Sequence, residues 1–137
     1  MNRRDFLMAT AAVTLAMPLR ARAAAADYTP DLLQAELAAG KTVFLDFKAS
    51  WCSTCAAQER AINALLQENP AYEKAIRFIN VDWDQWGNGD LVRQLNIPRR
   101  STLVVLKGDK ELGRIVAGTA KDEIKALMDL ALQAATA

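Results

Sequence analysis

Segments whose apolar residues are spaced as in strands alternate along the chain with segments whose apolar residues are spaced as in helices. Residues 42–49 are rich in β-branched and aromatic residues and apolar on both faces, which is typical of a strand covered on two sides. Residues 53–69 are good helix formers with apolar side chains on one side, and Pro70 ends the run. Residues 75–82 are predicted to form the next strand, parallel to the first and reached by a right-handed crossover.

The segments around this core extend the pattern. Thr29 and Pro30 indicate a helix start, because a hydroxyl can cap the first turn and proline is tolerated there, and Gly40 ends that helix. Residues 83–90 are predicted to be a loop from their Gly and Asn content. A short helix is expected over residues 90–96, with its first aspartate as the cap.

The C-terminal part predicts a hairpin and a last helix. Residues 101–107 and 111–118 have strand composition and flank a three-residue turn at 108–110. A helix is expected to begin near Thr119, and its apolar stripe consists of Ile124, Leu127, Met128 and Ala131. The complete order predicts an α/β fold, with a mixed four-stranded sheet and helices on both faces.

Composition and charge narrow the possible functions. A chain of 137 residues that is 52% hydrophobic can bury one core, and a net charge of +1 without long charged runs does not favour nucleic acid or an anionic membrane surface as a partner. The chain contains no histidine, which excludes Ser-His and Cys-His catalysis and His-ligated metal sites. Its two cysteines supply only half of the usual zinc ligands.

Residues 1–23 have the layout of a signal peptide. The Arg3–Arg4 pair precedes an uncharged stretch over residues 6–19, which is too short to span a bilayer, and small residues end at Ala23. The arginine pair with the following Asp-Phe-Leu resembles a twin-arginine export signal; a general secretion signal and a retained amphipathic helix are the alternatives. We expect cleavage after Ala23, which leaves residues 24–137 as an exported, periplasmic or otherwise extracytoplasmic domain where disulfides persist.

The candidate chemistry lies in the stretch "FLDFKASWCSTC", residues 44–55. Cys52 falls where the predicted strand gives way to a helix, and a helix N-terminus favours the thiolate over the thiol. Cys55, one turn later, lies close enough to Cys52 to form a disulfide with it. We therefore expect Cys52 to be the nucleophile of thiol–disulfide exchange and Cys55 the resolving cysteine. A structural disulfide or two inert buried thiols are the alternatives.

Taken together, these residues resemble the thioredoxin family over almost all of residues 29–134. The points of similarity are Asp46, six positions before Cys52, Phe47, the run 51–55, "INVD" at 79–82 and the hairpin from Thr102 to Thr119. The resemblance implies a thioredoxin-like fold and a protein-disulfide oxidoreductase that needs no cofactor beyond its redox-active disulfide. It also implies client proteins with disulfides or thiols, and an upstream thiol electron donor such as a membrane-bound relay.

The resemblance assigns Asp46 a catalytic role as proton acceptor for the resolving thiol. A carboxylate in a central strand must be paired, hydrogen-bonded or raised in pKa. The family usually pairs this acid with a lysine on the neighbouring strand, where this chain has Phe78. Lys48, on the same face two residues along, is our expected substitute. A surface acid on an edge strand is the alternative reading of Asp46.

The family also places a cis-proline opposite the cysteines. An ungapped match puts Ser101 at that position, and a shifted match would put Pro98 there. In the family this loop pairs with the substrate, and Trp51 is expected to be a partly exposed lid over the disulfide. The residues expected to contact substrate are Trp51, Ser53, Thr54, Arg100 and Ser101. Arg99 and Arg100 form either a solvated pair or a charge that favours the Cys52 thiolate.

The residues between the cysteines bear on the direction of electron flow. Strong oxidants of the family commonly carry a histidine there, and Ser53 and Thr54 lack it, which favours a reductant. A carrier of a soft ion such as Cu(I), bound by the same two thiolates, is the alternative from another class, and an interaction domain with an inert disulfide is a third. Residues 82–90 only faintly resemble a calcium loop, because Trp86 and Arg93 occupy ligand positions.

Overall fold

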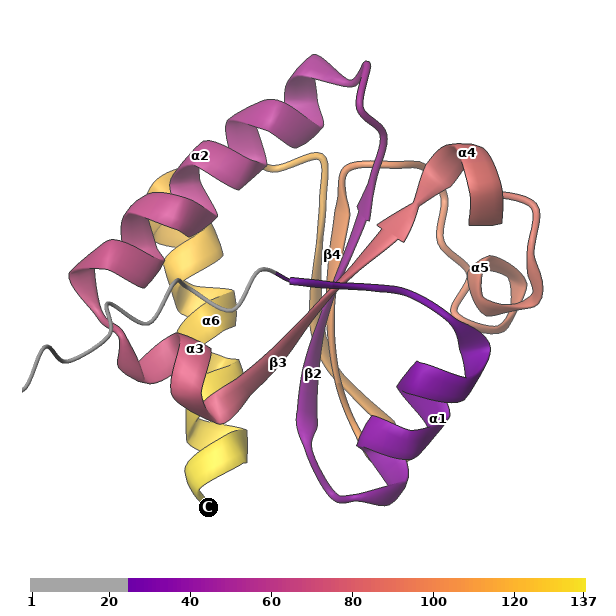
Figure 1. Ribbon diagram of the computed structural model, residues 1–137. Helices are drawn as coiled ribbons and strands as arrows, with labels where there is room; N and C mark the ends of the chain where they lie inside the picture. Colours follow the sequence, from indigo (N-terminus) through magenta and orange to yellow (C-terminus); the bar gives the residue numbers. More distant parts are fainter. Residues whose placement is uncertain (1–24) are drawn as a thin grey trace, which may run out of the picture.

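The computed structural model describes residues 25–137, in which five strands form one mixed sheet (Figure 1). The strands are β1 (Ala26–Asp27), β2 (Thr42–Lys48), β3 (Ile76–Asp82), β4 (Thr102–Lys107) and β5 (Lys110–Val116). Their order across the sheet is β1-β3-β2-β4-β5; β1, β3 and β2 are parallel, while β4 and β5 are antiparallel to their neighbours. The predicted signal peptide, residues 1–23, lies outside the described residues.

Helices cover both faces of the sheet, as the sequence predicts. One face carries α1 (Pro30–Ala38), α4 (Trp83–Trp86) and α5 (Asp90–Gln94), and the other carries α2 (Ser53–Glu68), α3 (Ala71–Ala75) and α6 (Lys121–Thr136) (Figure 1). Alternate residues of β2 supply the two cores: Val43, Leu45 and Phe47 pack with the α1 side, while Phe44 packs with the α2 and α6 side. Asp46 is two residues beyond Phe44, so its side chain lies on the same face of β2 and points toward α2.

The predicted α/β fold with helices on both faces is confirmed, but the sheet has five strands, not four. The additional strand β1 has only two residues and pairs in parallel with β3, Ala26 opposite Ile79. An element this short carries no periodicity, so the sequence pattern could not reveal it. The hairpin turn is also shorter than expected: Lys110 pairs with Lys107, which leaves two residues in the turn, with Gly108 at φ +60°.

Helix ends differ from the predictions in several places. The predicted Thr29 cap is present, and its hydroxyl accepts a hydrogen bond from the Leu32 N–H at 3.1 Å. The segment expected to be a loop contains α4, because the Asp82 carboxylate caps its first turn by accepting from the Asp84 N–H at 3.0 Å. Gly89 is the cap residue before α5, and the last helix begins at Lys121 after Ala120.

The predicted stripe of the last helix is buried as expected, and its members are Ile124, Leu127, Met128 and Ala131. Trp86 of α4 packs edge-on against Tyr28 with ring centroids 5.0 Å apart, which attaches this short helix to the core. Within residues 25–137 no helix combines the length and the apolar character needed to cross a bilayer.

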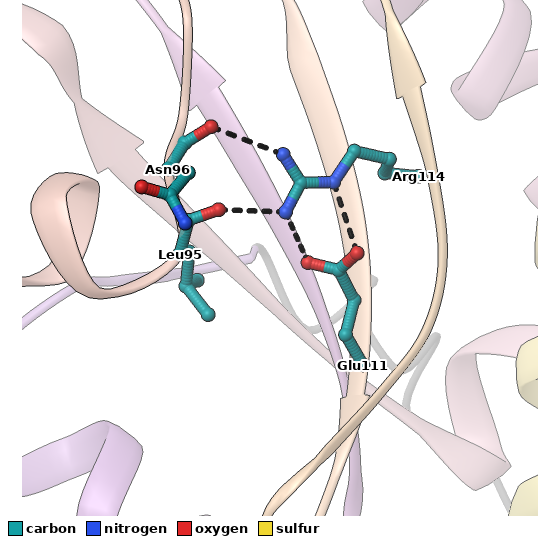
Figure 2. Close-up of polar contacts among 4 residues, drawn as sticks. All are labelled: Leu95, Asn96, Glu111 and Arg114. Carbon is teal, nitrogen blue, oxygen red and sulfur yellow. Dashed lines mark hydrogen bonds and ion pairs between the residues drawn. The ribbon is translucent and has the colours of Figure 1, made fainter.

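Arg114 of β5 connects the outer strand to the segment after α5 (Figure 2). Its guanidinium donates to both carboxylate oxygens of Glu111 and to the backbone carbonyls of Leu95, at 2.7 Å, and Asn96, at 3.2 Å. The bond to Glu111 raises the pKa of Arg114 further, so the guanidinium stays charged. This arrangement fixes the start of the loop that leads to Ser101.

Candidate active site

Cys52 and Cys55 lie at the junction of β2 and α2, as the sequence predicts, and are joined by a disulfide. Cys52 is the N-cap residue of α2, with an extended backbone, and the Cys55 N–H donates to its Sγ at 3.1 Å. An N–H of the first helical turn, one of those without a partner inside the helix, therefore points at the Cys52 sulfur. Both this donor and the positive end of the helix favour negative charge on that sulfur when the disulfide opens.

The disulfide is largely buried, with Cys52 4% exposed and Cys55 1% exposed. A cavity of about 420 Å³ lies beside it and is lined in part by both cysteines, Lys48 and Glu59. Cys55 is the less exposed of the two, and the division into an attacking and a resolving cysteine stays a prediction.

Asp46 lies six residues before Cys52, on the face of β2 that α2 covers. Its side chain is buried, with the residue 6% exposed, and its Oδ1 has no hydrogen-bond partner among the described residues. Burial raises the pKa of this carboxyl to about 7, while the charge of Lys48 lowers it and that of Glu59 raises it. The alternative of a surface acid on an edge strand is wrong, because β2 is the central strand.

Lys48 does not pair with Asp46 as we expected. Its ammonium forms an ion pair with Glu59 of α2 at 3.0 Å, and it acts on Asp46 only through its charge. The reason is position: Lys48 is the last residue of β2, where its half-buried side chain reaches the helix surface. In the sheet register Asn80 of β3 lies opposite Asp46, while Phe78 lies opposite Phe44.

Ser101, not Pro98, lies against the disulfide. Its Oγ is 3.1 Å from the Sγ of Cys52 and 3.1 Å from the Sγ of Cys55, whereas Pro98 is exposed. No peptide bond within residues 25–137 is cis, so the loop takes a trans path with Ser101 at φ +65°. A positive φ is uncommon for a residue with a Cβ, so this backbone is held by its surroundings.

Gln58 is a site residue that the sequence did not reveal to us. It lies one turn beyond Cys55 on α2, is fully buried, and donates through Nε2 to the carbonyls of Ser101 at 2.8 Å and Gly118 at 3.0 Å. A signal was present, because Gln58 shares the buried stripe of α2 with Cys55, Ile62 and Leu65. A polar residue on such a stripe needs a partner, and here the partner is the loop opposite the disulfide.

Trp51 and Arg100 form the exposed rim of the site. Trp51 is 59% exposed, its indole N–H donates to Asp84 of α4 at 3.0 Å, and the guanidinium carbon of Arg100 lies 4.4 Å from its ring centroid. Ser53 is exposed and Thr54 is half-buried. The structure therefore gathers the expected substrate-contacting residues around one disulfide, and it adds Asp84, which no sequence motif indicated.

The described residues offer no further ligands for a metal ion. Within residues 25–137 no group of three or more His, Cys, Asp or Glu side chains is placed to hold one. The copper-carrier alternative therefore gains no support, since it would depend on two buried sulfurs alone. The segment that faintly resembled a calcium loop forms α4 and the turn that follows it.

The fold and the site together define a class of proteins, in which a mixed sheet covered on both faces carries a Cys-x-x-Cys disulfide where a central strand passes into a helix. The chain belongs to the thioredoxin family: the family model described as Thioredoxin matches residues 24–130. The resemblance predicted from the motifs is thereby confirmed.

Individual relatives agree with this assignment. The chain is 33% identical to Thioredoxin H2 of Arabidopsis thaliana over 85 residues, which cover 62% of this chain and 59% of that protein. It is 31% identical to a thioredoxin of Echinococcus granulosus over 86 residues, 63% of this chain and 75% of that one. The matched region thus spans less than two thirds of the plant relative.

Solved structures give the same fold. The thioredoxin-like protein Trxlp of Edwardsiella tarda superposes with a TM-score of 0.62 at 25% identity, covering 76% of this chain and 95% of that one. The Malassezia sympodialis thioredoxin superposes with a TM-score of 0.65 at 21% identity, covering 77% of this chain and 91% of that one, and is evidence for the fold alone.

Proposed function

We propose that this chain is an exported thiol:disulfide oxidoreductase that exchanges disulfides with client proteins and acts as a reductant. The observation that carries the proposal is the Cys52–Cys55 disulfide at the first turn of α2, with the Cys55 N–H donating to the Cys52 sulfur. Membership of the thioredoxin family supports the reaction class.

The proposed reaction has two exchange steps. The Cys52 thiolate attacks one sulfur of a client disulfide, forms a mixed disulfide and expels the other client sulfur as a thiolate, which takes up a proton. Cys55 then loses its proton, attacks the Cys52 sulfur and releases the first client sulfur. Two electrons pass to the client, and the chain is left with its own disulfide. A carboxyl with a pKa of about 7, such as Asp46, is suited to accept the Cys55 proton near neutral pH.

The rim residues suit contact with a protein substrate. Trp51 offers an exposed aromatic face beside Cys52, and the guanidinium of Arg100 stacked on it adds hydrogen-bond donors. Ser53 and Thr54 complete the set proposed to contact the client, whereas Ser101, which the resemblance also placed there, is fully buried against the disulfide. An upstream thiol donor, such as a membrane-bound relay, would return the disulfide to the dithiol form.

A trapping experiment tests the exchange reaction. Cys55→Ser removes the resolving thiol, so client proteins should stay attached to Cys52 through a disulfide that dithiothreitol releases. The matched control, Cys52→Ser with Cys55→Ser, should capture nothing. If the wild-type chain, supplied with a dithiol, fails to reduce a model protein disulfide and Cys55→Ser traps no protein, the proposal is wrong.

Direction and export need separate measurements. A reductant is proposed because Ser53 and Thr54 lack a histidine, so the reduction potential should be more negative than that of the glutathione couple; a more positive value would reverse the assignment. Export is proposed from the residue pattern of 1–23. The full chain should lose this segment on export, and replacement of Arg3 and Arg4 by lysine should block the twin-arginine route but not general secretion.

A further inference from the structure

The hydroxyl of Ser101 contacts both sulfurs of the disulfide. Its Oγ lies 3.1 Å from the Sγ of Cys52 and 3.1 Å from the Sγ of Cys55, and the residue is completely buried. A serine hydroxyl has one hydrogen to donate and lone pairs that accept. When the disulfide is reduced, the hydroxyl can therefore donate to one sulfur and accept from the thiol of the other at the same time.

The backbone of Ser101 is held firmly in this position. Its N–H donates to the Phe47 carbonyl at 2.7 Å, and its carbonyl accepts from Gln58 Nε2 at 2.8 Å and from the Ala117 N–H at 2.9 Å. These three bonds attach the loop to β2, to α2 and to the end of β5. They hold a backbone at φ +65°, which is costly for a residue with a Cβ, so the placement of the hydroxyl is fixed by the surrounding elements.

We propose that Ser101 is a catalytic residue: once the disulfide opens, its hydroxyl donates a hydrogen bond to the Cys52 thiolate while its oxygen accepts one from the Cys55 thiol. This inference rests on the proposed exchange reaction. Cys52 would then have two donors, the Ser101 hydroxyl and the Cys55 N–H, which is 3.1 Å from its sulfur in the disulfide form. Two donors matter here, because an unpaired charge on a sulfur this deeply buried would be costly.

The opening step balances with a dithiol as the reductant. Two electrons from the dithiol break the Cys52–Cys55 bond, and the dithiol becomes a disulfide and gives up two protons. One proton remains on Cys55, and the other leaves to solvent when Cys52 stays a thiolate. Ser101 neither gains nor loses a proton in this step; it redirects its own hydrogen to the sulfur that carries the charge.

The hydroxyl favours the reduced form over the oxidised one. A disulfide sulfur is a weak, neutral acceptor, whereas a thiolate makes a charge-assisted hydrogen bond. The same contact is therefore stronger after reduction than before it. Ser101 should increase the fraction of Cys52 that is thiolate and make the chain less strongly reducing than it would be without the hydroxyl.

Ser101→Ala tests the role directly, since alanine keeps the Cβ and hence the same backbone cost. In the reduced full chain, thiolate absorbance at 240 nm should show the pKa of Cys52 raised by about one unit, because hydrogen bonds to charged groups contribute on that scale. The equilibrium with a dithiol buffer should shift about tenfold toward the disulfide, which is about 30 mV more negative in potential.

Thr102→Val is the matched control. Thr102 is the next residue, equally buried, and its hydroxyl donates to the Arg99 carbonyl at 2.7 Å without contacting either sulfur. Thr102→Val removes this hydrogen bond of the same loop, so the variant should have a lower urea midpoint. Its Cys52 titration and redox equilibrium should remain those of the wild type.

Ser101→Gly separates the hydroxyl from the backbone. Glycine also lacks the hydroxyl but removes the cost of the positive φ. The proposal requires that alanine and glycine shift the Cys52 titration in the same direction and by a similar amount. It is overturned if Ser101→Ala titrates like the wild type, or if alanine and glycine shift it in opposite directions. Failure of the wild type itself to exchange with a protein disulfide would instead overturn the proposed function.

Discussion

Asp46→Asn should change how the stability of the protein depends on pH. The carboxyl is buried with an unpartnered Oδ1, and burial raises its pKa from 3.8 to about 7. Between these values the folded protein holds a proton that the unfolded chain has lost, so the free energy of unfolding falls by about 1.4 kcal/mol per pH unit. The stabilisation is fully present below about pH 4 and is lost as the pH rises through 7, about 4 kcal/mol over the interval.

Asparagine cannot ionise, so the variant lacks this loss. We expect its stability relative to the wild type to rise by about 4 kcal/mol between pH 4 and pH 8, on top of a constant offset from the amide itself. Carboxyl groups that do not interact with Asp46 titrate alike in both proteins and cancel in the difference. Asp129, for example, has its pKa lowered by a hydrogen bond from Lys125, and its contribution cancels in the difference.

Urea unfolding of the oxidised protein at intervals from pH 4 to pH 8 measures the effect. The slope of the free energy against urea should be the same for both proteins, so that a change in midpoint reports stability. Asp109→Asn, in the exposed turn between β4 and β5, is a control for removing a surface carboxylate. Parallel pH profiles for the wild type and Asp46→Asn would refute a neutral buried carboxyl at this position.

Three further predictions concern the surroundings of the site. Arg114→Ala removes all the hydrogen bonds of Figure 2 and should lower the free energy of unfolding by about 1–3 kcal/mol. Amide hydrogen exchange over residues 95–101 should become faster, and unchanged exchange would contradict the role given to Arg114. Lys48→Met should raise the pKa of Asp46 and Glu59→Gln should lower it, as followed by carboxyl carbon NMR; equal titrations in both variants would refute this coupling. Gln58→Leu removes the donor to the buried Ser101 carbonyl and to the partly buried Gly118 carbonyl, and it should cost about 1–3 kcal/mol in urea unfolding. An unchanged midpoint would show that water replaces the donor.

The main elements could be predicted because each is long enough to show its period. The strand at Thr42–Lys48 and the helices at Pro30–Ala38 and Ser53–Glu68 follow the apolar pattern closely. The misses are the short elements β1, α3 and α4, which have two, five and four residues. Elements of this length are decided by neighbours in space, such as the β3 edge that β1 completes, and not by their own sequence.

The site was predictable where its residues are close in sequence. The three-residue separation of Cys52 and Cys55 can be read directly from the sequence, and the apolar pattern predicts the strand-to-helix junction around them. The position of Ser101 came from the family resemblance, and its contact with both sulfurs depends on tertiary structure. The Lys48–Glu59 ion pair likewise depends on how α2 crosses β2, which no local pattern determines.

The outermost strand of the sheet bears on how the protein behaves at high concentration. β5 is a lateral edge, yet it carries Lys110, Glu111 and Arg114, and the pairing with β4 slips between Val105 and Leu106. A second molecule that tried to add a strand there would have to strip water from three charges and match an irregular ladder. Self-association through β5 is therefore disfavoured even when the protein is concentrated.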